Sequence, residues 1–270
     1  MFFGCIRLEA YICAKLGWSL RLLMTVHGII TGDIVSSREI DAPLREKLFD
    51  EMGALLKELK KHWISSYETY RGDSLQCQVQ SAESVLRVAL IIRCFFRAYF
   101  PDELKPKLTV KKGDATKGYF ATNFDIRLGI GIGSIDFVKK NKITSSDGEA
   151  FRLSGEALDS LSQGPQKFAI KTFNAAFNEQ MEPPVLLLDA LIQKWTQNQA
   201  ELVLYKLQNK KEEEIAATLK ITQSAVNQRT KTAQWMAIEK LILYFEKTVK
   251  TIKWLLFLHM QKEACLFAYS

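Results

Sequence analysis

Two aspartates that each follow a glycine are the residues of this sequence best suited to bind a metal ion. Asp33 follows Gly32 directly after the β-branched run 26–31, and Asp73 follows Gly72 at a turn. Two carboxylates in one place are hard oxygen ligands, which suit Mg²⁺ or Mn²⁺ with a bound triphosphate. Each Gly–Asp pair on its own could equally be ordinary turn chemistry. The metal site therefore depends on whether the fold brings the two aspartates together.

The order of the predicted elements places these aspartates side by side. Residue patterns predict strands at 26–31, 67–71, 75–79 and 125–135, and helices at 41–62 and 81–99. The alternating run 166–172 is a candidate additional edge strand. A β-α-β-β-α-β order is that of a ferredoxin-like sheet, so the predicted fold class is α+β with a palm-type domain. In that sheet the end of the first strand lies beside the turn between the second and third strands. Asp33 and Asp73 are therefore expected to face each other.

Residues next to the aspartates complete the expected site. The backbone carbonyl of Ile34 could supply a further metal ligand, and Gly32 and Gly72 would let a nucleotide come close to the backbone. Arg71 is the nearest cation in sequence for a phosphate, although it could equally pair with Glu68 or remain solvated. The expected cofactor is Mg²⁺ or Mn²⁺, and the expected ligand is a nucleotide.

A helical module with a tight turn is predicted within residues 197–248. The helix 212–219 begins with three glutamates, which suit a helix N-terminus, and a three-residue turn leads to a second helix over 223–242. Ile215, Leu219 and Val226 have the spacing that packs two helices across such a turn. The pattern predicts a helix-turn-helix that binds double-stranded DNA. The alternative is a helical hairpin used for packing or dimerisation. Lys220 occupies the turn position where glycine is usual.

The outward side of the second helix carries the side chains expected to contact DNA. Amides and hydroxyls near the start of such a helix can hydrogen-bond to base edges, and later cations can hold phosphates. The expected DNA-binding residues are Gln223, Ser224, Asn227, Gln228, Arg229 and Lys231. One module of this kind binds weakly, so a homodimer is expected.

The chain divides, on this interpretation, into four parts. Residues 1–24 form an N-terminal extension, of which residues 1–23 lie outside the native product if translation starts at Met24. Residues 25–181 form the ferredoxin-like domain, and Pro183-Pro184 marks the boundary near the start of the helical domain, 182–248, in which the first helix is expected at 186–195. Residues 249–270 form a C-terminal helix or tail.

Charge and cysteine content indicate which partner and which cellular compartment the sequence favours. Of the net charge of +7, residues 197–270 contribute +4, since they hold 11 Lys and Arg against 7 Asp and Glu; this fits a polyanionic partner. The five cysteines are odd in number and form no CxxC pair, which favours a reducing, cytoplasmic compartment over a disulfide framework or a zinc site. No apolar run reaches the roughly 18 residues of a membrane span, so no membrane association is expected.

Several segments resemble the SatD family of bacterial proteins, in its longer form with a C-terminal helix-turn-helix. The matching segments are ITGDIVSSREI, YRGDSLQ, IRLGIGIG, KITSSDGEAFRLSGEALD and EEEIAATLKITQSAVNQR. The resemblance covers roughly residues 25–245. It implies an architecture more than an activity.

A more distant resemblance adds chemistry. The strand that ends at Asp33, the Gly72–Asp73 hairpin and the glycine-rich strand 127–133 are similar to the palm domain of class III nucleotidyl cyclases, in which two such aspartates bind metals. A cyclase helix there carries an Asn and an Arg; the matching stretch here puts Arg152, a nucleotide-binding candidate, and Glu156 at those places. A glutamate cannot stabilise developing negative charge on a phosphate. The C-terminal module resembles region four of sigma factors.

Three functions follow from these features. The favoured one is a DNA-binding transcriptional regulator whose cyclase-like domain binds a metal–nucleotide ligand. The second is a metal-dependent nucleotidyl cyclase or nucleotidyltransferase with an appended helix-turn-helix, for which the sequence leaves catalytic residues unassigned. The third is a non-catalytic interaction protein.

Overall fold

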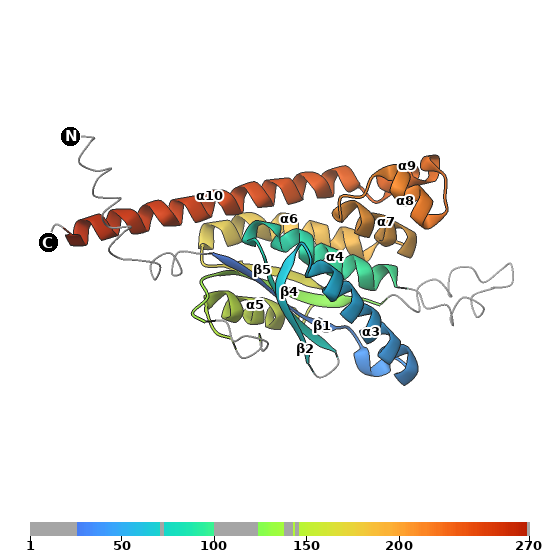
Figure 1. The fold of residues 1–270 in the computed structure, drawn as a ribbon, viewed down its shortest axis with the longest axis horizontal. Helices are drawn as coiled ribbons and strands as arrows, with labels where there is room; N and C mark the ends of the chain where they lie inside the picture. Colours follow the sequence, from blue (N-terminus) through green and yellow to red (C-terminus); the bar gives the residue numbers. More distant parts are fainter. Residues whose placement is uncertain (1–25, 71–72, 100–123, 138–142, 144–145, 269–270) are drawn as a thin grey trace.

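The computed structural model describes residues 26–70, 73–99, 124–137, 143 and 146–268, with side chains described as far as Lys253. It shows a mixed α/β fold in which helices cover both faces of a five-stranded sheet (Figure 1). The strands are β1 (His27–Ile34), β2 (Ile64–Tyr70), β3 (Ser74–Val79), β4 (Ile126–Gly133) and β5 (Phe168–Thr172). The helices are α3 (Ala42–Leu59), α4 (Val85–Ala98), α5 (Glu149–Ser160), α6 (Ala175–Gln193), α7 (Gln197–Leu207), α8 (Glu212–Leu219), α9 (Gln223–Thr232) and α10 (Trp235–Ala268). Two short 3-10 turns, η1 and η2, span Ser37–Glu39 and Ala82–Ser84.

The central strand of the sheet is β1. The strand order is β2-β3-β1-β4-β5, with β1 antiparallel to both neighbours and β5 parallel to β4. Gly32 and Asp33 were predicted to end the first strand, and this was wrong. They lie within β1 because both neighbours continue beside them: Asp33 stands opposite Ser74 on β3 and Arg127 on β4.

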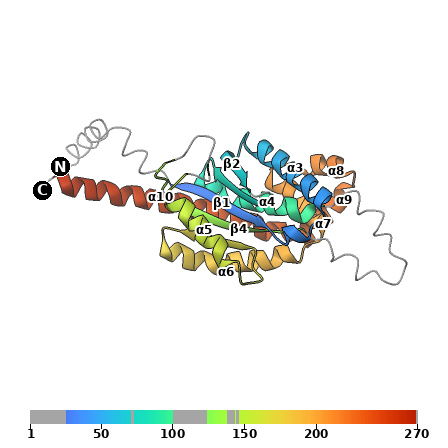
Figure 2. The ribbon, with the colours of Figure 1, turned by 90° about the horizontal axis from the view of Figure 1, so that it is seen from below.

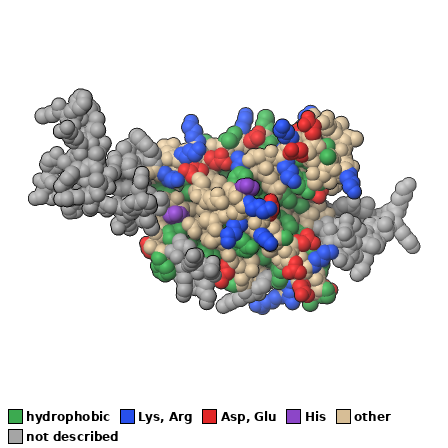
Figure 3. All heavy atoms as spheres, in the orientation of Figure 1, with side chains coloured by type: hydrophobic (Ala, Val, Ile, Leu, Met, Phe, Trp, Pro, Cys, Tyr) green, Lys and Arg blue, Asp and Glu red, His purple; other side chains and the backbone are tan. Residues whose placement is uncertain are grey.

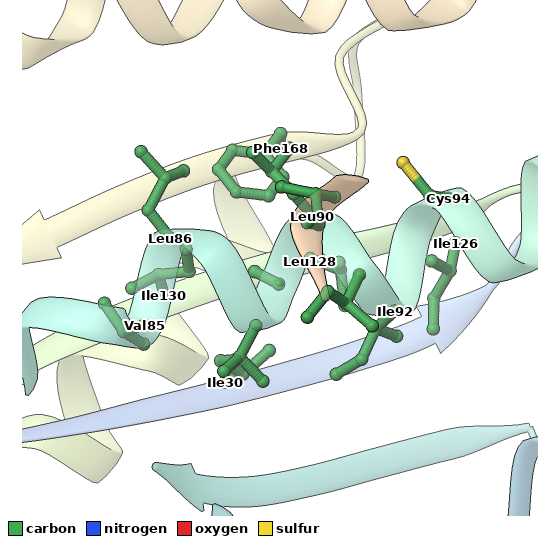
Figure 4. Packing of buried hydrophobic residues seen from close by; sticks show 14 of the residues in the cluster. Ile30, Val85, Leu86, Leu90, Ile92, Cys94, Ile126, Leu128, Ile130 and Phe168 are labelled. Carbon is green, nitrogen blue, oxygen red and sulfur yellow. The ribbon is translucent and has the colours of Figure 1, made fainter. Parts of the chain in front are cut away.

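Helix α4 forms the centre of the main core. Its side chains from Val85 to Ile92 are at most 1% exposed, except for Arg87, because the sheet lies on one side and α7 and α10 pack on the other. Figure 4 shows its apolar side chains set against residues of β1, β4 and β5, among them Ile30, Leu128 and Phe168. Helix α3 adds its buried leucines to the same cluster.

Helix α5 lies on the opposite face of the sheet, directly against β4 (Figure 2). The alternating glycines of β4 permit this close approach. A Cβ on Gly131 would lie 2.1 Å from the carbonyl oxygen of Ala150, and one on Gly129 would lie 2.4 Å from that of Ser154. The helix backbone therefore occupies the space that side chains would fill on an ordinary strand.

Helix α6 runs through the point where the sequence predicted a break. Pro183 and Pro184 lie inside it, and the helix begins at Ala175, capped by the Asn174 side chain, rather than near Leu186. Interior prolines remove a backbone hydrogen bond and crowd the preceding turn. Burial of the opposite side of the helix offsets that cost; the residues concerned are Phe177, Met181, Val185, Leu188 and Ile192. Pro183-Pro184 thus marks no break in secondary structure.

The last two helices are separated by a sharp break. The sequence predicted one helix from Gln223 through Ile242, but α9 ends at Thr232 and Gln234 takes a left-handed conformation with φ 59°. Helix α10 then runs back over α6 and α4 and extends beyond the sheet at its C-terminal end (Figure 1).

Candidate functional site

Asp33 and Asp73 come together at one end of the sheet. Asp73 directly precedes Ser74, the residue paired with Asp33, and its backbone carbonyl accepts a 2.9 Å hydrogen bond from the amide of Ile34. The antiparallel pairing of β1 and β3 produces this approach, since the end of one strand lies beside the start of the other. The predicted juxtaposition of the two aspartates is therefore present.

The carboxylate of Asp33 is held by Arg127, a residue that the sequence analysis did not select. The Nε of Arg127 donates to Oδ1 of Asp33 at 3.1 Å, and Nη2 donates to Oδ2. Such bidentate pairing fixes both oxygens in one plane. The side chains are 29% and 26% exposed, so the pair is open to solvent on one side. The strand that carries Arg127 was predicted from the sequence. Its pairing with Asp33 was not, because it depends on the register of that strand against β1.

The carboxylate of Asp73 accepts hydrogen bonds from hydroxyl groups. Ser37 donates to Oδ2 at 2.9 Å and Ser74 donates to Oδ1 at 3.3 Å. Ser37 is buried in η1, the short turn that follows β1. No sequence pattern indicated Ser37, because its approach to Asp73 depends on a left-handed residue, Ser36 with φ 51°, that turns the chain back toward the hairpin.

The space that a side chain at Gly32 would fill is taken by β4, and the nucleotide-binding role of Gly32 stays a prediction. A Cβ at this position would lie 2.6 Å from Leu128 Cδ2 and 3.0 Å from the carbonyl oxygen of Arg127. The lack of a side chain thus lets β1 and β4 pack. Ile34 places its side chain in the core at 4% exposure, and the ligand role of its carbonyl stays a prediction.

Of the remaining nucleotide-binding candidates, only Arg152 lies among the described residues, and it is not brought to this point. Arg71 and Gly72 lie outside the described residues. Arg152 pairs with Asp147 at 3.2 Å and Asp136 at 3.8 Å. Asp136 and Asp147 both come after Gly133, the last residue of β4. Arg127 lies near the opposite end of that strand, six residues before Gly133. The structure therefore separates Arg152 from the two aspartates.

The two aspartates offer hard oxygen ligands but too few of them to enclose an ion. Among the residues described, no group of three or more His, Cys, Asp or Glu side chains is placed to hold a metal. Mg²⁺ commonly binds through one or two carboxylates, with phosphate and water oxygens completing its shell. The residues present thus fit a metal that arrives with a phosphate ligand.

Helices α8 and α9 form the second candidate site. They are joined by residues 220–222; Lys220 takes the left-handed conformation with φ 54° and ψ 44°, and Thr222 caps α9 by accepting a 3.2 Å hydrogen bond from the amide of Ala225. A small apolar cluster holds the pair together, namely Leu202, Ile215, Ala216 and Val226. The turn thus forms without glycine, with the strain borne by one lysine.

The outward face of α9 presents the predicted DNA-binding side chains. Only Val226 of this helix is buried. Five of the six candidates are exposed and Arg229 is half-buried; the exposed ones are Gln223, Ser224, Asn227, Gln228 and Lys231. The surface is therefore polar, basic at its C-terminal end, and accessible.

A buried charged cluster joins the sheet to the helices behind it. Arg93 of α4 donates to Asp125 at 3.0 Å through Nε and to Asp189 of α6 through Nη1. Burial alone would lower the pKa of Arg93, but the two carboxylates raise it, so the guanidinium stays charged. Asp189 also accepts from the amide of Lys167 at 3.1 Å and from Gln193 at 2.9 Å. With its groups all engaged, the cluster is structural.

Comparison with known proteins gives a limited result. No family model and no curated protein matches the chain. Among solved structures, a bacterial light-regulated adenylyl cyclase is similar at 15% identity, with 58% of this chain and 79% of that chain covered and a TM-score of 0.36. The SatD and sigma-factor resemblances therefore stay predictions. In the described part of the chain, no helix has both the length and the apolar content that membrane crossing requires.

Proposed function

We propose that the chain is a DNA-binding regulator that contacts double-stranded DNA through α9. The observation that carries the proposal is the α8–α9 pair itself. Its three-residue turn, capped second helix and shared apolar cluster support a helix-turn-helix, in which α9 enters the major groove. The exposed amides of Asn227 and Gln228 are suited to base edges, and Lys231 is suited to a phosphate.

Selection from a random pool of duplex DNA, followed by titration of the selected duplex, tests this proposal. Asn227→Ala combined with Gln228→Ala should reduce the preference for the selected duplex over a scrambled one. Lys231→Ala should weaken binding to both duplexes and lower the slope of log affinity against log salt by about 1. A matched control is Lys57→Ala on α3, which removes an exposed lysine far along the chain. Equal affinity of all four proteins for both duplexes would defeat the proposal.

We further propose that the end of the sheet that carries Asp33 and Asp73 binds a nucleotide together with Mg²⁺ or Mn²⁺, in a domain of ferredoxin-like, cyclase-like type. The β2-β3-β1-β4 part of the strand order and the meeting of the two aspartates support this assignment. The metal would neutralise charge on the phosphates. The Asp33–Arg127 pair supplies both a carboxylate for the metal and, on opening, a guanidinium for a phosphate.

Substitution of the two aspartates distinguishes a protein that only binds a nucleotide from one that also turns it over. Binding of nucleoside triphosphates in the presence of Mn²⁺ should be lost in Asp33→Asn and Asp73→Asn, which keep side-chain volume but remove charge. Product formation by the wild type that is lost in both variants would instead favour the metal-dependent nucleotidyl cyclase or transferase. Unchanged binding in both variants would remove the site from the function altogether.

A further inference from the structure

The charges of α10 divide between two sides of the helix. On the inner side, Glu246 pairs with Arg87 at 3.0 Å and Lys253 pairs with Glu83 at 3.0 Å, which ties α10 to α4 and to η2. These pairs hold the helix in place and leave little charge on that side for a partner.

The outer side carries three lysines with no such role. Lys240, Lys247 and Lys250 are exposed, and none of them forms an ion pair with a described side chain. At about 100° per residue they lie within roughly 80° of one another around the helix, and over ~15 Å of its length. Among the side chains of this helix that are described, which end at Lys253, Glu239 is the one exposed acid. The outer side is therefore a basic stripe.

This stripe continues the surface proposed to bind DNA. Helix α10 starts three residues after α9 ends, and α9 lies at the same upper edge of the molecule (Figure 1). Figure 3 shows Lys and Arg side chains along that edge, over α10. Exposed lysines thus follow one another along the chain at Lys231 of α9 and at 240, 247 and 250 of α10, with Glu239 as an exposed acid between them.

We propose that the outer side of α10 binds the phosphate backbone of the same DNA that α9 contacts; this rests on the proposed DNA-binding function. One DNA strand presents a phosphate every ~3.4 Å along its axis, so ~15 Å of helix faces about four phosphates. Two copies of the chain would not join through this face, because like charges would meet. Met236 and Leu243, exposed at 69% and 54%, lie among the lysines, so an anionic lipid surface is the competing partner to test.

The test compares two triple variants of the full chain. Lys240→Gln with Lys247→Gln and Lys250→Gln should reduce the salt-dependence slope of duplex binding by about 2.7, or roughly 0.9 per lost phosphate contact, without changing preference between duplexes. The control is Lys57→Gln with Lys60→Gln and Lys61→Gln at the end of α3, which changes the net charge equally and should bind as the wild type does. Circular dichroism spectra that match the wild type are the check that both variants fold.

The outcomes separate this inference from the function on which it rests. A wild type that binds no duplex would overturn both. Binding that is weakened by Lys231→Ala but has an unchanged slope in the α10 triple variant would overturn the stripe alone. Loss of sedimentation with phosphatidylserine vesicles in the α10 variant, with duplex affinity retained, would assign the stripe to lipid and likewise overturn it.

Discussion

Asp33 and Arg127 face each other on neighbouring antiparallel strands, and their side chains form a bidentate ion pair at the end of the sheet. A metal ion and Arg127 cannot both occupy the two oxygens of this carboxylate. In Arg127→Gln we therefore expect Mn²⁺ alone to bind roughly tenfold more tightly, as isothermal titration would measure, because no guanidinium must be displaced.

The same variant should bind a nucleoside triphosphate with Mn²⁺ more weakly, since the cation released from Asp33 is no longer available to a phosphate. Arg152→Gln, which removes an arginine at the far end of β4, is the matched control and should leave both affinities unchanged. If Arg127→Gln has no effect on either ligand, the ion pair has no part in binding.

The glycines of β4 and α5 give opposite predictions for the same substitution. Gly131→Ala should lower the free energy of unfolding by about 3 kcal/mol or more, because the new methyl group meets backbone atoms of α5 at 2.1 and 2.4 Å. Gly155→Ala should raise it by about 0.5–1 kcal/mol, since this site lies in α5 with nothing within 4 Å. Urea unfolding of both variants measures the contrast, and equal effects would refute the packing argument.

Removal of the buried cation should be far more costly than removal of an exposed one. Arg93→Met leaves Asp125 and Asp189 buried without their partner, and we expect a loss of about 3–5 kcal/mol in the free energy of unfolding. Lys61→Met breaks the exposed pair with Glu58 and should leave the urea midpoint unchanged. A mild effect of Arg93→Met would mean that water reaches the cluster.

His27 should make stability fall in mildly acidic solution. Burial, and then the nearby charge of Lys253, hold the pKa of His27 below its usual value of 6.5. The unfolded chain therefore binds a proton more readily, so the contribution of His27 is complete above pH 6.5 and is lost as pH falls toward the lower folded-state pKa.

His27→Gln should flatten that dependence while keeping an acceptor for the Gln78 amide, which lies 3.3 Å from Nδ1. The measurement is the thermal midpoint at pH values from 7.5 to about 5. His62→Gln, at an exposed histidine, should keep the wild-type slope. A slope that is the same in all three proteins would assign the acid sensitivity to other groups.

The sequence patterns predicted every described strand of the sheet and the meeting of Asp33 with Asp73. Local periodicity and element order suffice for that, because both follow from chain connectivity. They could not predict Arg127 as the partner of Asp33, since strand register depends on contacts 94 residues apart. The same applies to the Arg93 cluster, whose members come from three distant segments.

Two local rules failed because tertiary packing outweighed them. Pro183-Pro184 looked like a helix boundary, yet the buried side of α6 holds the helix through both prolines. Gly32-Asp33 looked like a turn, yet pairing on both sides keeps it within β1. Lys220 occupies the turn position where glycine is usual, and the turn forms there nonetheless.

The position of β1 between β3 and β4 limits how the end of the sheet that carries Asp33 can move. A strand with partners on both sides exposes its amides only when the whole sheet opens, so hydrogen exchange near Asp33 should report global unfolding. Binding loops are usually drawn from the least protected parts of a protein. Here Asp33 lies in β1, and Asp73 directly precedes β3, which also has partners on both sides, so adjustment to a ligand is expected from η1, which holds Ser37.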